Sequence, residues 1–236
     1  CRWWIFSLVK KINILAVVPA RSASKGIPNK NIRKIKGIPL LAYSIKYALR
    51  SKIIDKVMVS TDSRKYAKIA KKYKAEVPYL RKKKLSKDDV TDYPVINDAL
   101  TQCEKIYKKK YNYVVLLRPT SPFREKNLIE KSYKLLKKNP KATSVRSVKK
   151  IDNHPYRSWI LKNEFMFGFV KNIHEPYNIP RQKLPLIMFQ TGDIEFIKRS
   201  TLIKGSISGE KVLPIIIKKY FDLDSPADLK KLKIKN

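Results

Sequence analysis

Short apolar runs alternate along the chain with longer stretches in which apolar residues recur at helical spacing. The runs lack strict alternation, which is typical of strands buried on both faces of a parallel sheet. They begin at Ile12 (INILAVVPA), Lys56 (KVMVSTD), Tyr113 (YVVLLR) and Ala142 (ATSVRSV), and a further short strand is expected from Ala75 (AEVPYL). The helical stretches begin at Pro39, Ser63, Pro94 and Glu125. This order predicts a three-layer α/β fold with right-handed crossovers.

The alternation breaks between Asp152 and Pro185. This segment contains aromatic residues, prolines and two short strand-like runs, but no long amphipathic helix. It predicts an inserted subdomain or arm, and exposed aromatic residues on it would suit a partner surface. A lid packed on its own domain is the alternative. The chain then resumes with GDIEFIKRS, KVLPIII and FDLDSPADLKKLK.

Length and composition fit one large α/β domain, since 236 residues with 43% hydrophobic content can bury a core. We expect this domain over residues 11–236, with residues 152–180 as the arm. Residues 1–10 begin at Cys1 without methionine, and we expect them to be a truncated or processed extension of undecided nativeness. Their apolar run, WWIFSLV, is too short to span a bilayer. We therefore expect a cytoplasmic protein with no membrane partner.

The two cysteines and two histidines argue against a disulfide framework or a zinc site. A net charge of +35 would ordinarily indicate nucleic acid or an anionic membrane. The lysines, however, are scattered along the whole chain and fall mostly on the polar faces of the expected helices. A lysine-rich proteome, in which lysine replaces other solvated residues, explains this pattern as well. We therefore expect nonspecific polyanion binding in low salt and no specific nucleic-acid partner.

The loop PARSASKGIPNKN joins the first strand to the next element. Ligands of open α/β sheets bind outside the carboxyl ends of the strands, where this loop lies. It carries the cations Arg21, Lys25 and Lys30, and Gly26 lets backbone amides approach a ligand. This combination suits a polyphosphate, although the spacing is neither that of a P-loop nor G-x-G-x-x-G. An ordinary basic loop is the alternative.

A second chemical signal is the stretch YFDLDSP near the end of the sequence. Asp222 and Asp224 are two residues apart, so on an extended segment their side chains leave the same face. Paired carboxylates at a strand-to-helix junction suit Mg²⁺ shared with substrate phosphates. Alternatively, Asp224 only helps to cap the helix that begins near Pro226, and Asp222 is solvated.

Six strings in order over residues 12–230 carry a family resemblance: PARSASKGIPNKN, VSTD, LLRPTSPFR, PRQKLP, TGDIEF and DLDSPADL. The chain closely resembles the acylneuraminate cytidylyltransferases, or CMP-sialic acid synthetases. The sister family that acts on 3-deoxy-octulosonate is similar in the first loop but normally has Thr-Arg where this chain has SKG. The resemblance implies a Rossmann-like nucleotidyltransferase fold with a mostly parallel sheet and an inserted dimerisation arm.

The resemblance also implies a reaction, in which CMP passes from CTP to the anomeric hydroxyl of a nonulosonic acid and pyrophosphate is released. The alternatives are the same chemistry on an octulosonate or another sugar, and an inactive relative that binds polyanions. The CTP-binding positions carried over are Arg21, Ser24, Lys25, Lys30, Asn31 and Arg81. The catalytic positions are Arg21, Lys25, Asp222 and Asp224, of which the two aspartates hold Mg²⁺. Either a metal-bound hydroxyl or Asp222 is a candidate general base.

The acceptor-binding positions are Arg118, Arg157, Arg181, Gln182 and Phe189, with Arg157 reaching across a homodimer into the partner's site. Three positions depart from the family. Asp92 falls about where a family serine contacts the nucleotide, Arg118 stands for a glutamine, and Phe189 for an arginine. The last two changes move positive charge to a new place and make one wall of the acceptor pocket more apolar. We therefore expect a legionaminic-type or related bacterial nonulosonic acid as acceptor, in preference to N-acetylneuraminic acid.

Overall fold

The computed structural model describes residues 12–24 and 26–234, with side chains up to residue 230. The extension expected over residues 1–10, and Lys25 of the first loop, lie outside the described residues. The central sheet consists of six strands, which are β1 (Ile14–Pro19), β4 (Lys56–Ser60), β5 (Tyr113–Leu116), β6 (Ser144–Lys150), β9 (Met188–Lys198) and β10 (Val212–Ile216). The helices are α1 (Leu40–Leu49), α2 (Arg64–Lys72), α3 (Asp92–Tyr107), α4 (Leu128–Lys138), α5 (Arg199–Ile203) and α6 (Pro226–Ile234).

The strands lie in the order β10-β6-β9-β5-β1-β4. β1 pairs in parallel with β4 and β5, and β6 pairs in parallel with β10, so the predicted mostly parallel sheet is confirmed. β9 is the exception, because it runs antiparallel to both β5 and β6. Lys150 at the end of β6 pairs with Met188 at the start of β9, so the arm is the connection of a long β-hairpin. Such a connection needs no crossover helix.

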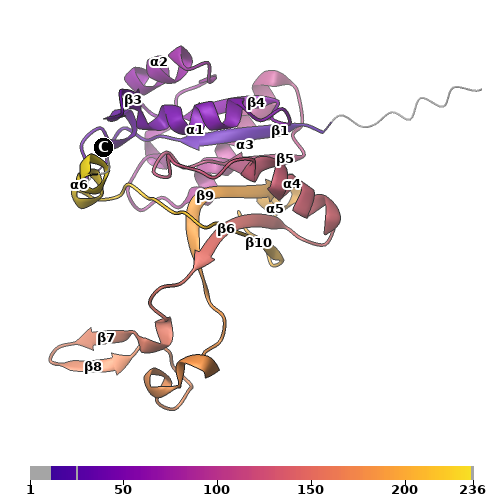
Figure 1. The fold of residues 1–236 in the computed structure, drawn as a ribbon. Coiled ribbons are helices and arrows are strands. Elements are labelled where there is room, and N and C mark those ends of the chain that lie inside the picture. The colour runs from indigo at the N-terminus through magenta and orange to yellow at the C-terminus, as the bar shows by residue number, and fades with distance from the viewer. Residues whose placement is uncertain (1–11, 25, 235–236) are drawn as a thin grey trace, which may run out of the picture.

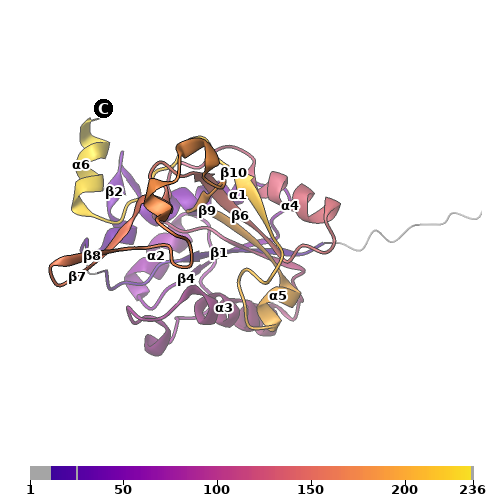
Figure 2. The same cartoon turned by 90° about the horizontal axis from the view of Figure 1, so that it is seen from below.

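Two layers of helices cover the sheet, as Figures 1 and 2 show. Alternate residues of β1 contact the two helix layers. Ile14 and Val18 belong to an apolar cluster shared with α1, α2 and α4. Leu15 and Val17 belong to a second cluster, shared with α3 and α5. Residues on a strand alternate between its faces, and both faces of β1 are buried. The predicted three-layer α/β architecture is confirmed.

One expected strand is absent. Over residues 75–80 the structure has only an isolated parallel bridge between Met58 and Glu76. Pro78 interrupts this segment, and proline has no N–H to donate to a strand ladder.

A small apolar cluster holds the long connection from β1 to α1 in place. This connection contains a 3-10 helix (Lys30–Ile32) and the strands β2 (Lys34–Ile35) and β3 (Ile38–Pro39), which form a hairpin. The two turn residues, Lys36 and Gly37, both have positive φ, as a tight hairpin turn requires. Ile27, Ile35 and Leu40 pack with Leu223 from the far end of the sequence. This contact brings the two predicted chemical motifs together.

The inserted segment extends away from the sheet, as Figure 1 shows. Its hairpin consists of β7 (Trp159–Lys162) and β8 (Phe165–Gly168), and 3-10 helices cover Pro155–Arg157, Pro176–Asn178 and Arg181–Lys183. The most exposed large apolar side chains of this hairpin are Leu161 at 71% and Phe165 at 69%. In the part of the chain that the structure describes, no helix is long and apolar enough to cross a bilayer.

Candidate functional site

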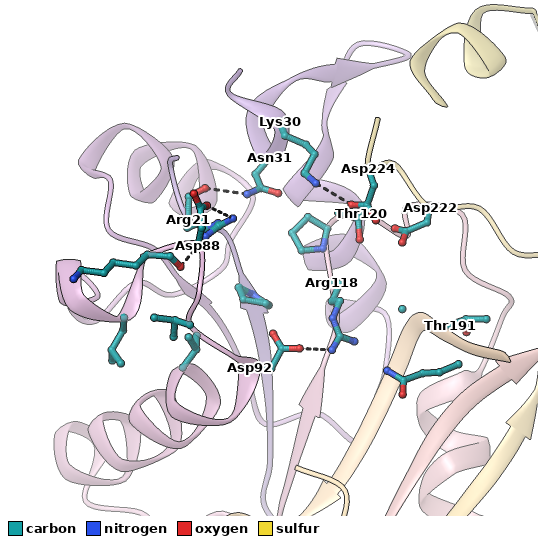
Figure 3. Close-up of a pocket in the computed structure, with 18 of the residues that line it drawn as sticks. Arg21, Lys30, Asn31, Asp88, Asp92, Arg118, Thr120, Thr191, Asp222 and Asp224 are labelled. Carbon is teal, nitrogen blue, oxygen red and sulfur yellow. Dashed lines mark hydrogen bonds and ion pairs between the residues drawn. The ribbon is translucent and has the colours of Figure 1, made fainter. Parts of the chain in front are cut away.

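A cavity of about 540 Å³ lies beside the carboxyl ends of β1 and β5. Pro19 from the end of β1 and the segment 118–120 that follows β5 contribute to its wall. Parallel strands bring their carboxyl ends to one edge of a sheet. Because β9 is antiparallel, its beginning lies at the same edge, and residues 189–192 complete the wall. Figure 3 shows the residues that converge there from distant parts of the sequence.

The first loop enters this cavity through Arg21. Its guanidinium donates to the Lys87 carbonyl oxygen at 2.8 Å and pairs with the Asp88 carboxylate at 2.7 Å. Asn31 supports the loop by donating to the Arg21 carbonyl oxygen at 3.0 Å. Lys30 also lines the cavity, whereas Ser24 is not among the described residues that line it. The first loop therefore places two cations and one amide at the cavity.

Asp62 fixes the shape of the first loop, a role that the sequence analysis missed. The backbone N–H and the hydroxyl of Ser22 each donate to its carboxylate at 2.8 Å. Asp62 follows the end of β4, the strand next to β1, so its position after an expected strand was a readable signal.

Arg81, in the connection between α2 and α3, also lines the cavity, with only 5% of its surface exposed. Its Nε donates to the Ser86 hydroxyl at 3.0 Å, but its Nη2 has no hydrogen-bond partner among the described residues. Burial lowers the pKa of this guanidinium. Because buried polar groups are nearly always paired, an unpaired donor at a cavity wall indicates a place for a ligand oxygen.

Asp222 and Asp224 lie at the same cavity on either side of the buried Leu223. The Leu223 N–H donates to the Thr120 carbonyl oxygen at 2.9 Å, which ties this segment to the loop after β5. A Cβ added at Gly26 would come within 3.1 Å of the Asp224 carbonyl oxygen, so the glycine permits the close approach of the first loop.

The contacts of the two aspartates bear on their expected roles. Asp228 accepts hydrogen bonds from the Ser225 N–H and hydroxyl at 2.9 and 2.7 Å, so a residue other than Asp224 holds the start of α6. Tyr220 donates to Asp222 Oδ2 at 3.0 Å, while the buried Oδ1 has no partner among the described residues. Burial raises the pKa of Asp222, a side-chain hydrogen bond with Thr120 partly opposes this rise, and the charge of Asp224 adds to it. A cation between these carboxylates would satisfy the unpaired oxygen.

Arg118 lies at the cavity wall, but its charge is already balanced. It forms ion pairs with Asp92 and with the fully buried Glu195. Burial alone would lower the pKa of Arg118, and these two carboxylates raise it above the usual value. Two of the departures from the family, Asp92 and Arg118, therefore compensate each other. Phe189, the third, forms an edge-on contact with Tyr220, with ring centroids 6.1 Å apart.

The remaining expected acceptor residues lie elsewhere in a single chain. Arg157 and Arg181 line a separate depression of about 720 Å³ on the arm, where Arg157 donates to the Ile179 carbonyl oxygen at 3.3 Å. Gln182 is in the 3-10 helix with Arg181 and is not among the described residues that line either space. Their expected contact with the acceptor stays a prediction, and only that of Arg157 is expected to act across a homodimer.

The cytidylyltransferase family model matches residues 15–159, which is more than half of the chain. The chain belongs to the cytidylyltransferase family. It is 33% identical over 220 residues to post-translational flagellin modification protein B of Campylobacter coli, covering 92% of both chains. It is also 33% identical over 222 residues to the CMP-N,N'-diacetyllegionaminic acid synthase of Legionella pneumophila, covering 92% of this chain and 93% of the other. The family predicted from the sequence motifs is confirmed, and with it the class of CTP-dependent nucleotidyltransferase.

A comparison with solved structures tests the predicted fold. A solved CMP:2-keto-3-deoxy-manno-octonic acid synthetase complexed with CTP superposes with a TM-score of 0.69 at 16% identity, over 94% of this chain and 98% of that one. The predicted Rossmann-like nucleotidyltransferase fold is confirmed.

Proposed function

We propose that this cytidylyltransferase transfers CMP from CTP to the anomeric hydroxyl of a nonulosonic acid and releases pyrophosphate. The observation that carries the proposal is the meeting of the first loop and the DLD segment, where Lys30 Nζ lies 3.0 Å from Asp224 Oδ1 at one cavity. Cations for phosphates and carboxylates for a metal ion are thereby adjacent. The similarity to a legionaminic acid synthase over 92% of the chain supports a nonulosonic rather than an octulosonic acceptor.

The chain's own cations bind the nucleotide. Arg21 and Lys30 hold the triphosphate from the first loop, together with Lys25, and Arg81 contributes its unpaired Nη2. In the free protein Arg21 is paired with Asp88 and Lys30 with Asp224. Phosphate oxygens replace these carboxylates when CTP binds, since both cations form charge-assisted hydrogen bonds with a triphosphate, which carries more negative charge than a carboxylate.

Asp222 and Asp224 would hold Mg²⁺ together with phosphate oxygens of CTP. Their fit rests on the unpaired, buried Oδ1 of Asp222 and on a donor set made of carboxylate oxygens alone. Bound there, Mg²⁺ would neutralise charge on the α-phosphate and on the departing pyrophosphate.

The reaction asks for little covalent chemistry from the protein. The anomeric oxygen forms a bond to the α-phosphorus in line with the bond that breaks, and pyrophosphate takes the electron pair of that bond. The anomeric hydroxyl gives up its proton to a general base, for which the Asp222 carboxylate is this chain's candidate. Arg21, Lys25 and Lys30 stabilise the charge that accumulates on the phosphate oxygens, and the cavity walls align the two substrates. A CTP-dependent reaction needs the cellular nucleotide pool, so we place the protein in the cytoplasm.

The arm supports a homodimer in this proposal. Its hairpin exposes more large apolar surface than a solvated connection needs, and residues such as Phe165 and Phe167 lie on it. In a dimer, Arg157 and Arg181, which lie outside the cavity of their own chain, could contact the acceptor in the cavity of the second copy.

Pyrophosphate release tests the proposal directly. The purified protein is incubated with CTP, Mg²⁺ and a panel of nonulosonic acids, with 3-deoxy-octulosonate as the competing acceptor. Release that depends on a nonulosonic acid supports the proposal, and release only with the octulosonate supports the sister reaction. No release with any sugar acid, together with polyanion binding, identifies an inactive relative.

A further inference from the structure

Gln190 lies at the cavity wall near the start of β9, beside Val148 of the neighbouring strand. Its side-chain oxygen accepts a hydrogen bond from the Arg146 guanidinium. An arginine can only donate, so Arg146 fixes which end of the carboxamide it faces. The Nε2 amide, with two N–H donors, is left for a ligand.

A buried carboxylate holds Arg146 in this position. One oxygen of Glu195, which is fully buried, pairs with Arg146, and the other pairs with Arg118. Arg118 also pairs with Asp92. The cluster of Asp92, Arg118, Arg146 and Glu195 therefore contains two positive and two negative charges. Its net charge is zero, so this wall presents a neutral donor rather than a free cation.

Gln190 stands between the aromatic Phe189 and the polar Thr191. The Lys149 ammonium lies over the rings of Phe189 and Tyr220, 6.0 and 5.8 Å from their centroids, and it pairs with Asp152. Phe189 lines the same cavity and is 44% exposed, and its edge-on contact with Tyr220 forms a continuous aromatic surface. An N–H donor beside an aromatic surface matches a substituent that carries a carbonyl oxygen and a methyl group. A sugar carboxylate fits less well, because the cations here, Arg118, Arg146 and Lys149, are already paired with carboxylates.

We propose that Gln190 determines acceptor specificity by donating from Nε2 to the carbonyl oxygen of an N-acyl substituent, whose methyl group packs on Phe189 and Tyr220. This inference rests on the proposed function, because it assigns one wall of the same cavity to the sugar acid. Arg146 and Glu195 are positioning residues, since they orient the carboxamide.

Two variants of Gln190 separate the effect of losing the N–H donors from the effect of adding a charge. Gln190→Met removes both N–H donors without adding charge, and Gln190→Glu keeps an oxygen for Arg146 but adds a negative charge. Gln102→Met on α3, outside the residues that line the cavity, is the matched control. The probes are N-acetylneuraminic acid and its deaminated counterpart, in which a hydroxyl replaces the acetamido group.

The KM of each acceptor and of CTP is measured by pyrophosphate release. Both Gln190 variants should raise the KM of the acetamido sugar by about fivefold to tenfold, as the loss of one hydrogen bond implies. The KM values of the deaminated sugar and of CTP should stay within about twofold, and the control should match the wild type. Equal effects on both sugars, or an effect of Gln190→Glu alone, would overturn the inference.

Saturation-transfer NMR distinguishes a failure of this inference from a failure of the proposed function. The wild type could bind sugar acids without turning them over, in which case the reaction assignment fails. Saturation transfer from the protein to the acetyl methyl in the wild type, and its loss in Gln190→Met, would then still support the inference. Turnover without any transfer to that methyl group overturns the inference and leaves the reaction assignment standing.

Discussion

Lys30 and Asp224 are 194 residues apart in the sequence, yet Lys30 Nζ lies 3.0 Å from Asp224 Oδ1. This pair joins the first loop to the last chemical motif, as Figure 3 shows. Leu223 packs into the apolar cluster beneath the first loop, so the contact rests on buried packing as well as on charge. The phosphate-binding cations and the carboxylates therefore belong to one site.

Lys25→Ala should weaken CTP binding and lower turnover, each by about tenfold, because it removes one cation from the phosphates. Calorimetric titration with CTP and the rate of pyrophosphate release measure the two effects. Lys137→Ala on α4, which is exposed, is the control. Unchanged affinity and rate in Lys25→Ala would make the first loop an ordinary basic loop.

Glu195→Gln should lower the free energy of unfolding by about 3 kcal/mol, because it leaves two arginines without their buried carboxylate. Urea denaturation measures the change. Glu210→Gln, on the exposed loop before β10, removes the same charge and should change stability by less than about 0.5 kcal/mol. Equal stability of the two variants would show that the cluster around Glu195 contributes nothing.

The protein should be a homodimer at micromolar concentration, with β7 and β8 in the interface. Light scattering measures the mass, and Phe165→Asp combined with Phe167→Asp should yield monomers, because both side chains are exposed in the single chain. A wild-type protein that is monomeric throughout the micromolar range contradicts the role of the arm.

A legionaminic-type acid should be a better acceptor than N-acetylneuraminic acid. The aromatic surface at Phe189 favours deoxy and N-acylated groups over a hydroxylated tail, and an apolar contact of this size changes kcat/KM by about tenfold or more. The ratio of kcat/KM for the two sugars measures the preference. A clear preference for N-acetylneuraminic acid would refute this reading of the pocket and leave the transferase assignment intact.

The sequence predicts much of the fold because its signals are local. The branched run that forms β1 and the helical stripe that forms α1 are each read within one segment. The antiparallel direction of β9 could not be predicted in this way, because it depends on pairing with β5 and β6 across long sequence separations. The prediction of a strand over residues 75–80 was wrong for a local reason, because Pro78 has no backbone N–H to donate to a strand ladder.

The site is predictable where its residues follow expected strands. Arg21 follows β1, so topology alone brings it to that edge of the sheet. Asp222 and Asp224 follow the distant strand β10, and the contacts of Leu223 with Thr120 and with the cluster beneath the first loop bring them there. The compensation of Arg118 by Asp92 and Glu195 was not readable, because it depends on side-chain packing between three separate elements. The places of Arg157 and Arg181 likewise depend on where the arm extends.

Phosphorus NMR of CTP, Mg²⁺ and a nonulosonic acid tests the central claim most directly, because it shows which phosphate bond breaks. We predict that the wild type yields pyrophosphate and a CMP diester in equal amounts. Asp224→Asn should slow both by about 100-fold or more while remaining folded by circular dichroism, and Glu210→Gln should match the wild type. Formation of CDP and inorganic phosphate, or full activity in Asp224→Asn, would contradict the account.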